Sequence, residues 1–236
     1  MSFEADPRQG VMDRELVKNI LDKVGRDDRY TKTPLANLTF ENLYNKLQPQ
    51  EVELIIDLLA IDPKTLGFMG PFVTMENPPR DLAAIEGQQY TRGGENMIIA
   101  NQYAPQRVLD AFQKMKQAIG DELQSDLLIE SGYRSPAHQA IVFLTYLELS
   151  DFNIRYVASG VALPGFSQHG DPVNTALDVL NQDGIPTDEE PELFEKTKEY
   201  AWLVQNAGKF GFFLSYPRDN PHGVKFEPWH WRYSPV

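Results

Sequence analysis

The sequence predicts an α+β fold in which helices flank a small antiparallel sheet and an N-terminal helical extension precedes them. Apolar residues recur at helical spacing over residues 1–66. From residue 98 onward, short apolar runs of strand length alternate with helical patterns, an order typical of α+β domains. Residues 67–97 are rich in Pro and Gly and show no period. We therefore expect an extension over 1–66, a loop-rich connection over 67–97 and a main domain over 98–236.

Two helices are expected in the extension. In each, apolar residues return after three or four positions, so that they share one helix face. Pro49 suits the first turn of the second helix. The expected apolar faces are Leu16, Ile20, Leu21 and Val24 in the first helix and Val52, Ile55, Ile56 and Leu59 in the second.

The main domain is expected to begin with a helix that Pro105 opens and that ends at Gly120. A short buried strand follows at residues 127–129. Ser135 is typical of an N-cap, with Pro136 at the first helical position of the next helix. Later elements are a helix over residues 187–206 and strands over 210–214 and 229–233. The apolar faces are Val108, Leu109, Phe112 and Met115 in the first helix and Ala140, Phe143, Leu144 and Leu147 in the second.

Composition excludes several classes of partner and site. The net charge is −12 and no run of Lys or Arg occurs, which disfavours nucleic acid and anionic membrane surfaces as partners. The chain has no cysteine, so a metal would be held by imidazole and carboxylate groups. We expect no membrane span and a monomer. The first residues, MSFEADPRQG, show no signal peptide, so the expected location is the cytoplasm or, after removal of a leader, the cell envelope.

Residues 227–233 carry aromatic side chains at alternate positions. Successive side chains of a strand point to opposite faces. Trp229, Trp231 and Tyr233 are then expected to face the core, whereas His230 and Arg232 face a cleft. An aromatic edge strand with a solvated histidine is the alternative.

Glu227 lies three residues before His230, which a regular strand would place on the opposite face. Pro228 interrupts the strand ladder. Glu227 is therefore expected on the turn before the strand, with its carboxylate close to the imidazole of His230. His138, which follows the predicted N-cap, is expected to face solvent, and His222 is expected in a turn without a metal role.

Two further segments carry candidate site residues. Glycines flank the segment around His169, and Asp178 lies in a predicted strand at residues 176–180. His169, Asp178 and the distant His230 would supply three ligands and leave a fourth position open for water, as catalytic zinc requires. Glu227 is the candidate general base that takes a proton from that water. Arg134, between a strand and a capped helix, could bind a substrate carboxylate or stabilise an oxyanion; a structural salt bridge is the alternative.

In order and spacing, these segments resemble the motifs of the VanY/VanX-like zinc D,D-/L,D-carboxypeptidases and dipeptidases, over roughly residues 98–236. The resemblance implies a Hedgehog/D,D-peptidase-like fold and one Zn²⁺ ion bound by His169, Asp178 and His230. It also implies base catalysis by Glu227 and a substrate or oxyanion role for Arg134, with Ser167 and Gln139 in the substrate pocket. The matching residues are Tyr133, Arg134, Ser135, Gln139, Ser167, His169, Asp178, Glu227, Trp229, His230, Arg232 and Tyr233.

One departure from the family pattern concerns the aspartate. The family places it seven residues after the histidine, where this chain has Ala176. A two-residue insertion over residues 171–174 explains the shift and makes Asp178 the ligand. Asp171 is the rival ligand, but it is only two residues from His169.

The resemblance implies removal of a C-terminal D-amino acid, D-alanine in particular, from peptidoglycan stem peptides or precursors. A D-Ala-D-Ala dipeptidase or a peptidoglycan endopeptidase of the same family is the near alternative. A non-catalytic zinc-binding module similar to Hedgehog domains belongs to another class, and the presence of Glu227 and Arg134 argues against it. A two-metal phosphoesterase fits poorly, because no second carboxylate-rich cluster occurs.

Overall fold

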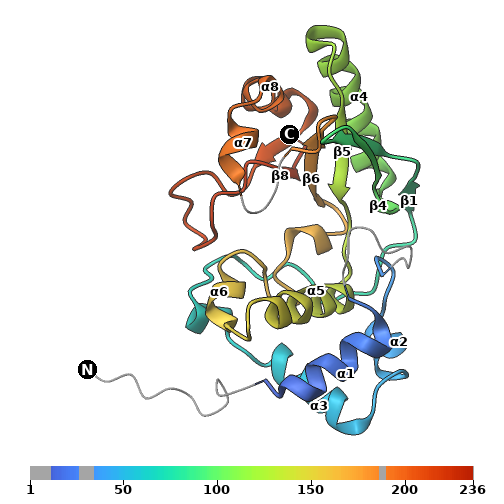
Figure 1. The fold of residues 1–236 in the computed structure, drawn as a ribbon, viewed down its shortest axis with the longest axis vertical. Helices are drawn as coiled ribbons and strands as arrows, with labels where there is room; N and C mark the ends of the chain where they lie inside the picture. The colour runs from blue at the N-terminus through green and yellow to red at the C-terminus, as the bar shows by residue number, and fades with distance from the viewer. Residues whose placement is uncertain (1–11, 27–34, 186–189, 236) are drawn as a thin grey trace.

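The computed structural model describes residues 12–26, 35–185 and 190–235. It divides into a helical half and a sheet half, one above the other along the longest axis (Figure 1). The predicted α+β class, with a small antiparallel sheet and flanking helices, is confirmed. Within the described ranges, none of the helices is long and apolar enough to cross a membrane.

The helical half packs short helices around one long, deeply buried helix. A hydrophobic core of residues from all these helices lies between them, and Ala140, Ile141 and Phe143 of the long helix are fully buried in it. Ser135 caps that helix by accepting a hydrogen bond from the backbone N–H of His138 (3.0 Å), as predicted. The helices are α1 (Arg14–Val24), α2 (Phe40–Tyr44), α3 (Pro49–Leu59), α5 (Pro136–Leu149) and α6 (Ile154–Ala158).

The sheet half contains an antiparallel sheet in the order β5-β6-β8-β7. Helices α4 and α8 bury a core against one face of it, where Leu177, Val179 and Trp231 point. Because strand side chains alternate, Asp178 and His230 point to the opposite face. The elements are β5 (Leu127–Ser131), β6 (Ala176–Asn181), β7 (Phe212–Leu214), β8 (His230–Tyr233), α4 (Gln106–Leu123), α7 (Pro191–Glu195), α8 (Lys198–Asn206), and the 3-10 turns η3 (Gln168–Gly170) and η4 (Ala207–Phe210). A further 3-10 turn, η2 (Pro63–Leu66), contacts α6 in the helical half.

The predicted helices of the extension are present, but the predicted apolar face of α3 is partly wrong. Leu54, Ile55 and Leu58 are buried, whereas Ile56 is 51% exposed. Several apolar residues in a row are compatible with more than one face, and the contact between α3 and α1 selects the buried one. The division of the chain at residues 66 and 97 stays a prediction.

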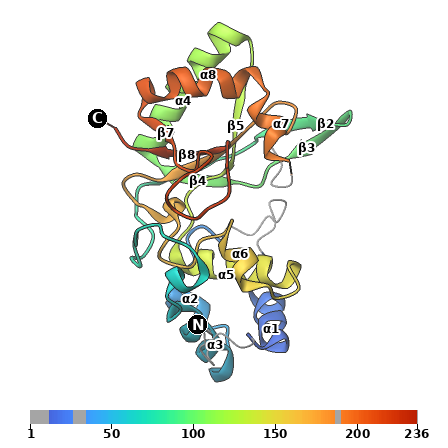
Figure 2. The same cartoon turned by 90° about the vertical axis from the view of Figure 1, so that its left-hand side faces the viewer.

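The prediction of a loop-rich connection over residues 67–97 misses three strands. Strand β1 (Leu82–Ile85) pairs with β4 (Gln102–Pro105), and β2 (Gln89–Arg92) pairs with β3 (Glu95–Ile98). Gly93 and Gly94, both with positive φ, form the β2–β3 turn, a conformation that favours glycine. Figure 2 shows this hairpin projecting from the sheet half. Strands β2 and β3 are largely exposed and β1 is half-buried, so the sequence lacks the apolar alternation that would have indicated them.

Other predicted boundaries shift. Helix α4 continues past Gly120 to Leu123, where Gln124 adopts the left-handed conformation that ends the helix. The helix predicted over 187–206 is instead α7 and α8, because Thr197 caps a new helix by accepting from the N–H of Tyr200. Residue 187 lies outside the described residues. Residues 207–210 form a 3-10 turn, so β7 begins only at Phe212.

An ion pair joins α1 to α3. Lys23 Nζ lies 2.5 and 2.7 Å from the carboxylate oxygens of Glu51, whose side chain is only 4% exposed. We expect Glu51→Gln to lower the free energy of unfolding at pH 7 by about 1.5–3 kcal/mol, the typical worth of a hydrogen bond to a charged group. Glu53→Gln, an exposed position on the same helix, should change it by less than about 0.5 kcal/mol. Urea denaturation measures both.

The effect of Glu51→Gln should depend on pH. Burial by itself would raise the pKa of the Glu51 carboxyl, but the hydrogen bonds from Lys23 and the Gln48 backbone hold it below its ordinary value of 4.5. The stabilisation is therefore complete above the unfolded-state pKa and is lost as the pH falls through the folded-state pKa. The difference from wild type should shrink below pH 4.5. Equal stability of the two proteins at pH 7 would contradict the assignment.

Candidate metal centre

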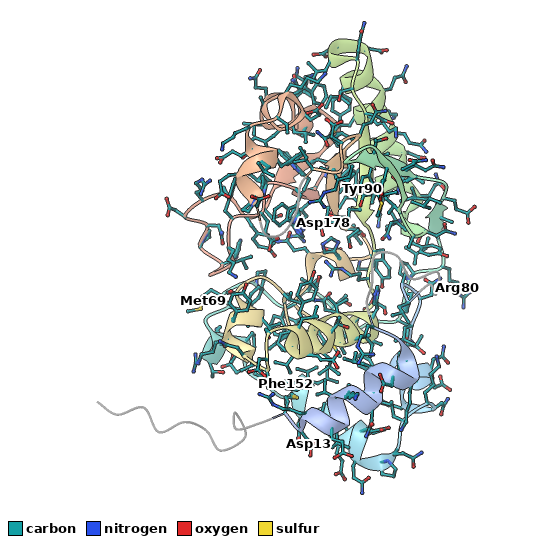
Figure 3. The ribbon with its side chains drawn as sticks, viewed as in Figure 1. Asp13, Met69, Arg80, Tyr90, Phe152 and Asp178 are labelled. Carbon is teal, nitrogen blue, oxygen red and sulfur yellow. The ribbon has the colours of Figure 1, made fainter. Side chains whose placement is uncertain are left out.

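Asp178 and His230 face each other across neighbouring strands. They are register partners in the β6–β8 pair, so their side chains leave the sheet on the same face at the closest spacing that a sheet provides. Asp178 Oδ1 lies 2.9 Å from Nδ1 of His230. In Figure 3, Asp178 lies on the side of the sheet half that faces the helical half. The predicted strand positions of both residues are confirmed.

His169 approaches the same aspartate from the η3 turn. Its Nε2 lies 3.2 Å from Asp178 Oδ2, and its ring stands at 82° to that of His230. Its Nδ1 is 2.8 Å from the carbonyl oxygen of Gly132, which only accepts, so Nδ1 carries a proton and donates it. A side chain at Gly132 would collide with the backbone of Tyr103, since a Cβ there would lie 2.2 Å from the Tyr103 oxygen. A glycine at position 132 therefore lets this segment pack against the Tyr103 backbone, which places the Gly132 carbonyl where it orients the His169 ring.

The three side chains fit a divalent cation. Their potential ligand atoms all lie within 4.8 Å of one another. With its proton on Nδ1, His169 turns the lone pair of Nε2 toward the carboxylate, and this buried atom has no hydrogen-bond partner in the described part of the chain. Two electron-rich atoms 3.2 Å apart repel unless a cation lies between them. Two imidazoles and one carboxylate also form a ligand set typical of catalytic zinc.

The ionisation of the cluster agrees with metal binding. Burial, and next the positive charge of Arg134, lower the pKa of His169 to about 4, so the ring is neutral at pH 7. Burial alone would raise the pKa of Asp178, but the two imidazoles beside it, first His169 and then His230, hold it well below its usual range. Neutral imidazole and ionised carboxylate are the forms that ligate metals.

Glu227 lies beside the cluster on the predicted turn. Its Oε2 is 3.7 Å from Nδ1 of His230. The backbone holds it there, because the N–H of Glu227 donates to the carbonyl of Tyr216 (3.1 Å) and the N–H of His230 donates to the carbonyl of Glu227 (3.2 Å). The side chain is 11% exposed. A carboxylate so placed can exchange protons with a molecule at the cluster.

Arg134 brings a positive charge to the same place. Its Nη2 lies 3.9 Å from Asp178 Oδ2, and its backbone N–H donates to the carbonyl of His169 (3.2 Å). Its Nε is buried and makes no hydrogen bond among the described residues. At 3.9 Å the contact with Asp178 is not a hydrogen bond, so the guanidinium keeps donors for another anion.

A cavity of about 620 Å³ opens beside the cluster. It lies between the sheet half and helices α5 and α6. The predicted pocket residues Ser167 and Gln139 both line it. Gln139 Nε2 donates to the carbonyl of Ala162 (2.7 Å), which leaves its buried Oε1 without a hydrogen bond in the described structure.

The rival ligand Asp171 is engaged elsewhere. Its Oδ2 accepts from Nη2 of Arg232 (2.8 Å), and its Oδ1 accepts from the backbone N–H groups of Val173 and Asn174. The structure thus brings Asp178, and not Asp171, to the two histidines. Arg232 pairs with Asp171 and does not line the cavity, contrary to prediction.

Two other predicted positions are wrong. His138 is buried, with 8% exposure, because α5 is covered on nearly all sides. Trp229 belongs to the turn before β8 and lines the cavity instead of the core around Trp231. His222 lies in a turn, as expected, and its lack of a metal role stays a prediction.

The sequence analysis missed Gln168 and Tyr216, which both contact His230. Gln168 Oε1 lies 3.1 Å from Nε2 of His230, and the Tyr216 ring lies 4.7 Å from the His230 ring. Burial, and next the negative charge of Glu227, raise the pKa of the Tyr216 hydroxyl, so it keeps its proton at neutral pH. For Gln168, its position next to His169 was the one feature of the sequence that could have indicated a contact with the site. No feature of the sequence indicated such a contact for Tyr216.

Comparisons with known proteins agree with these motifs. The family model named VanY, D-alanyl-D-alanine carboxypeptidase, matches residues 101–236, more than half of the chain. A D-alanyl-D-alanine carboxypeptidase of Enterococcus faecium is 27% identical over 210 residues, covering 87% of this chain but 60% of that enzyme. VanXYC of Enterococcus gallinarum, a bifunctional D-Ala-D-Ala dipeptidase and carboxypeptidase, is 29% identical over 137 residues, covering 56% of this chain and 67% of that protein. The solved structure of the LdcB LD-carboxypeptidase matches with a TM-score of 0.54 and 26% identity, over 73% of this chain and 78% of that chain.

Substitution of the two aspartates tests which one ligates the metal. We expect Asp178→Asn to weaken zinc binding by more than about 100-fold, beyond the cost of losing an outer hydrogen-bond partner. Asp171→Asn should leave the zinc affinity nearly unchanged but lower the stability, because Arg232 loses its partner. Competition with a chromophoric chelator measures the affinity. An equal loss of affinity in Asp171→Asn would move the ligand to that residue.

Proposed function

Since this chain belongs to the VanY family of D-alanyl-D-alanine carboxypeptidases, we propose that it is a zinc enzyme that removes a C-terminal D-amino acid, D-alanine, from peptidoglycan stem peptides or their precursors. The observation that carries the proposal is the convergence of His169, Asp178 and His230 beside the carboxylate of Glu227. The three side chains are the ligands in this proposal.

Glu227 is the general base and acid. Zinc held by the three ligands supplies a Lewis acid that polarises the scissile carbonyl and makes water acidic at neutral pH. The Glu227 carboxylate takes one proton from the attacking water and then delivers it to the nitrogen of the leaving D-amino acid. Its backbone anchor to Tyr216 keeps the carboxylate beside His230 during both transfers.

Arg134 binds the negative charge of the substrate, either its terminal carboxylate or the oxyanion of the tetrahedral intermediate. Both anions accept hydrogen bonds, and the guanidinium has donors to spare at the cluster. Gln139 offers its unpaired Oε1 to a substrate N–H, and Ser167 lines the same wall.

The extent of the cavity favours a peptide over a free dipeptide. From the cluster it continues along α5 to Tyr146 and Leu149 and reaches Tyr156 on α6. Residues on the N-terminal side of the scissile bond can occupy this region, whereas a dipeptide would leave most of it empty. The D-Ala-D-Ala dipeptidase is therefore the second candidate, and a non-catalytic zinc-binding module is the third, because a structural zinc needs neither Glu227 nor Arg134.

Replacement of the base should separate catalysis from metal binding. We expect Glu227→Gln to retain one zinc per chain and to lose about 10²- to 10⁴-fold in kcat, the usual contribution of general acid–base catalysis. His230→Ala should lose the metal as well. Glu195→Gln, on the surface at α7, should retain both. Zinc content and release of D-alanine are the two measurements; near-normal turnover in Glu227→Gln would disprove the role of this base.

Substrate length and stereochemistry decide the activity. The purified protein with zinc is offered a pentapeptide ending in D-Ala-D-Ala, the tetrapeptide that lacks the last residue, and free D-Ala-D-Ala. Release of D-alanine from the pentapeptide alone indicates a D,D-carboxypeptidase, and release from the tetrapeptide alone an L,D-carboxypeptidase. Cleavage of the dipeptide alone indicates the dipeptidase. Stoichiometric zinc without release from any of the three would support the binding module and overturn the proposal.

A further inference from the structure

Gln168 contacts one proposed ligand while its neighbour in the chain is another. It is the first residue of η3, directly before His169, and its side chain is almost fully buried. Its Oε1 lies 3.1 Å from Nε2 of His230 and 2.6 Å from Oγ of Ser215, which follows β7. A single amide oxygen thus meets two polar groups from two different segments of the chain.

The two contacts together define where the protons lie. The amide oxygen only accepts, so both partners must donate: Ser215 through its hydroxyl and His230 through Nε2–H. A neutral imidazole with its proton on Nε2 has a lone pair on Nδ1. That atom lies 2.9 Å from Asp178 Oδ1. The free lone pair of His230 is therefore directed at the proposed cation.

We propose that Gln168 is a positioning residue that holds His230 in the Nε2–H tautomer and so makes Nδ1 its metal ligand. This inference rests on the proposed metal site. It assigns Gln168 the same task for His230 that the carbonyl of Gly132 performs for His169. The two rings then present opposite nitrogen atoms, Nε2 of His169 and Nδ1 of His230, to the same carboxylate.

The ring contacts of His230 cannot do this, and the carboxylates of Asp178 and Glu227 lie on its Nδ1 side, where they favour a proton unless a cation takes its place. The rings of Tyr216 and His169 pack against it at 4.7 and 4.8 Å between centroids. Such packing restrains the plane of the imidazole but does not distinguish its two nitrogen atoms. Hydrogen bonds to the nitrogen that does not bind metal set the tautomer and raise the basicity of the ligand. Ser215, whose hydroxyl donates to the same amide oxygen at 2.6 Å, is the second polar group that holds this oxygen beside the ring.

Two substitutions at Gln168 test the proposal. Gln168→Met removes the acceptor at similar length, whereas Gln168→Glu keeps an acceptor and removes the NH₂ donor. We expect Gln168→Met to bind zinc about 10- to 100-fold more weakly, the usual cost of losing an outer partner of a ligand histidine. Gln168→Glu should bind zinc no more weakly than the wild type. Gln88→Met is the matched control, because Gln88 makes two hydrogen bonds to the backbone of Ile129 away from the site: it should lower stability and leave zinc affinity unchanged.

A second measurement reads the tautomer in the zinc-loaded proteins, because Asp178 would attract a proton to Nδ1 in the absence of a cation. Long-range nitrogen–proton NMR correlations should show the proton of His230 on Nε2 in the wild type and in Gln168→Glu, and distributed over both nitrogens in Gln168→Met. If Gln168→Met does not fold, Ser215→Ala provides the same comparison, with a smaller loss of zinc affinity expected.

A proton on Nδ1 in the wild type, or wild-type zinc affinity in Gln168→Met, would overturn the proposal. So would a Gln168→Glu protein that binds zinc as weakly as Gln168→Met, because the NH₂ group would then be the contact that matters. These failures leave the proposed function intact if the wild type binds one zinc and releases D-alanine. A wild type that releases none refutes the function, while the NMR correlations still decide the role of Gln168.

Discussion

The carboxylate of Asp178 is the group on which the whole site depends. Its two oxygens face two imidazole nitrogens, at 2.9 and 3.2 Å, and each ring donates an orienting hydrogen bond from its other nitrogen. These bonds direct two lone pairs and one negative charge at a single small volume. Without a cation these electron-rich atoms repel one another, so the arrangement favours the binding of a divalent ion.

The central strand β6 is what makes this possible. Leu177 and Val179 fix one face of the strand in the core beneath α4 and α8, and Asp178 between them must then face the other way. The neighbouring strand β8 repeats the pattern with Trp231 inward and His230 outward. The packed core thereby fixes the positions of Asp178 and His230 relative to each other, and a metal site requires such fixed positions for its ligands.

The loops provide the remaining groups through backbone contacts. Position 132 lies so close to the backbone of Tyr103 that only glycine fits there, and the carbonyl of Gly132 orients His169. The carbonyl of Tyr216 anchors the backbone of Glu227. The cavity then opens toward the helical half, so α5 and α6 shape the far end of the pocket while Asp178 and His230, two of the proposed ligands, lie on the sheet. This division allows substrate preference to vary without disturbing the ligands, as the different specificities of related carboxypeptidases and dipeptidases require.

The sequence by itself determined the residue types of the site, the α+β class and most helices, because caps, apolar periods and the motifs around His169 and His230 are local patterns. It did not determine the hairpins over residues 82–105 or the break before α8, since exposed strands and internal caps leave little trace in an apolar pattern. Only the tertiary structure shows that Asp178, and not Asp171, lies beside the two histidines. It alone also shows that His138 is buried and that Gln168 contacts His230. These outcomes depend on strand register and on contacts between segments tens of residues apart, which no local period encodes.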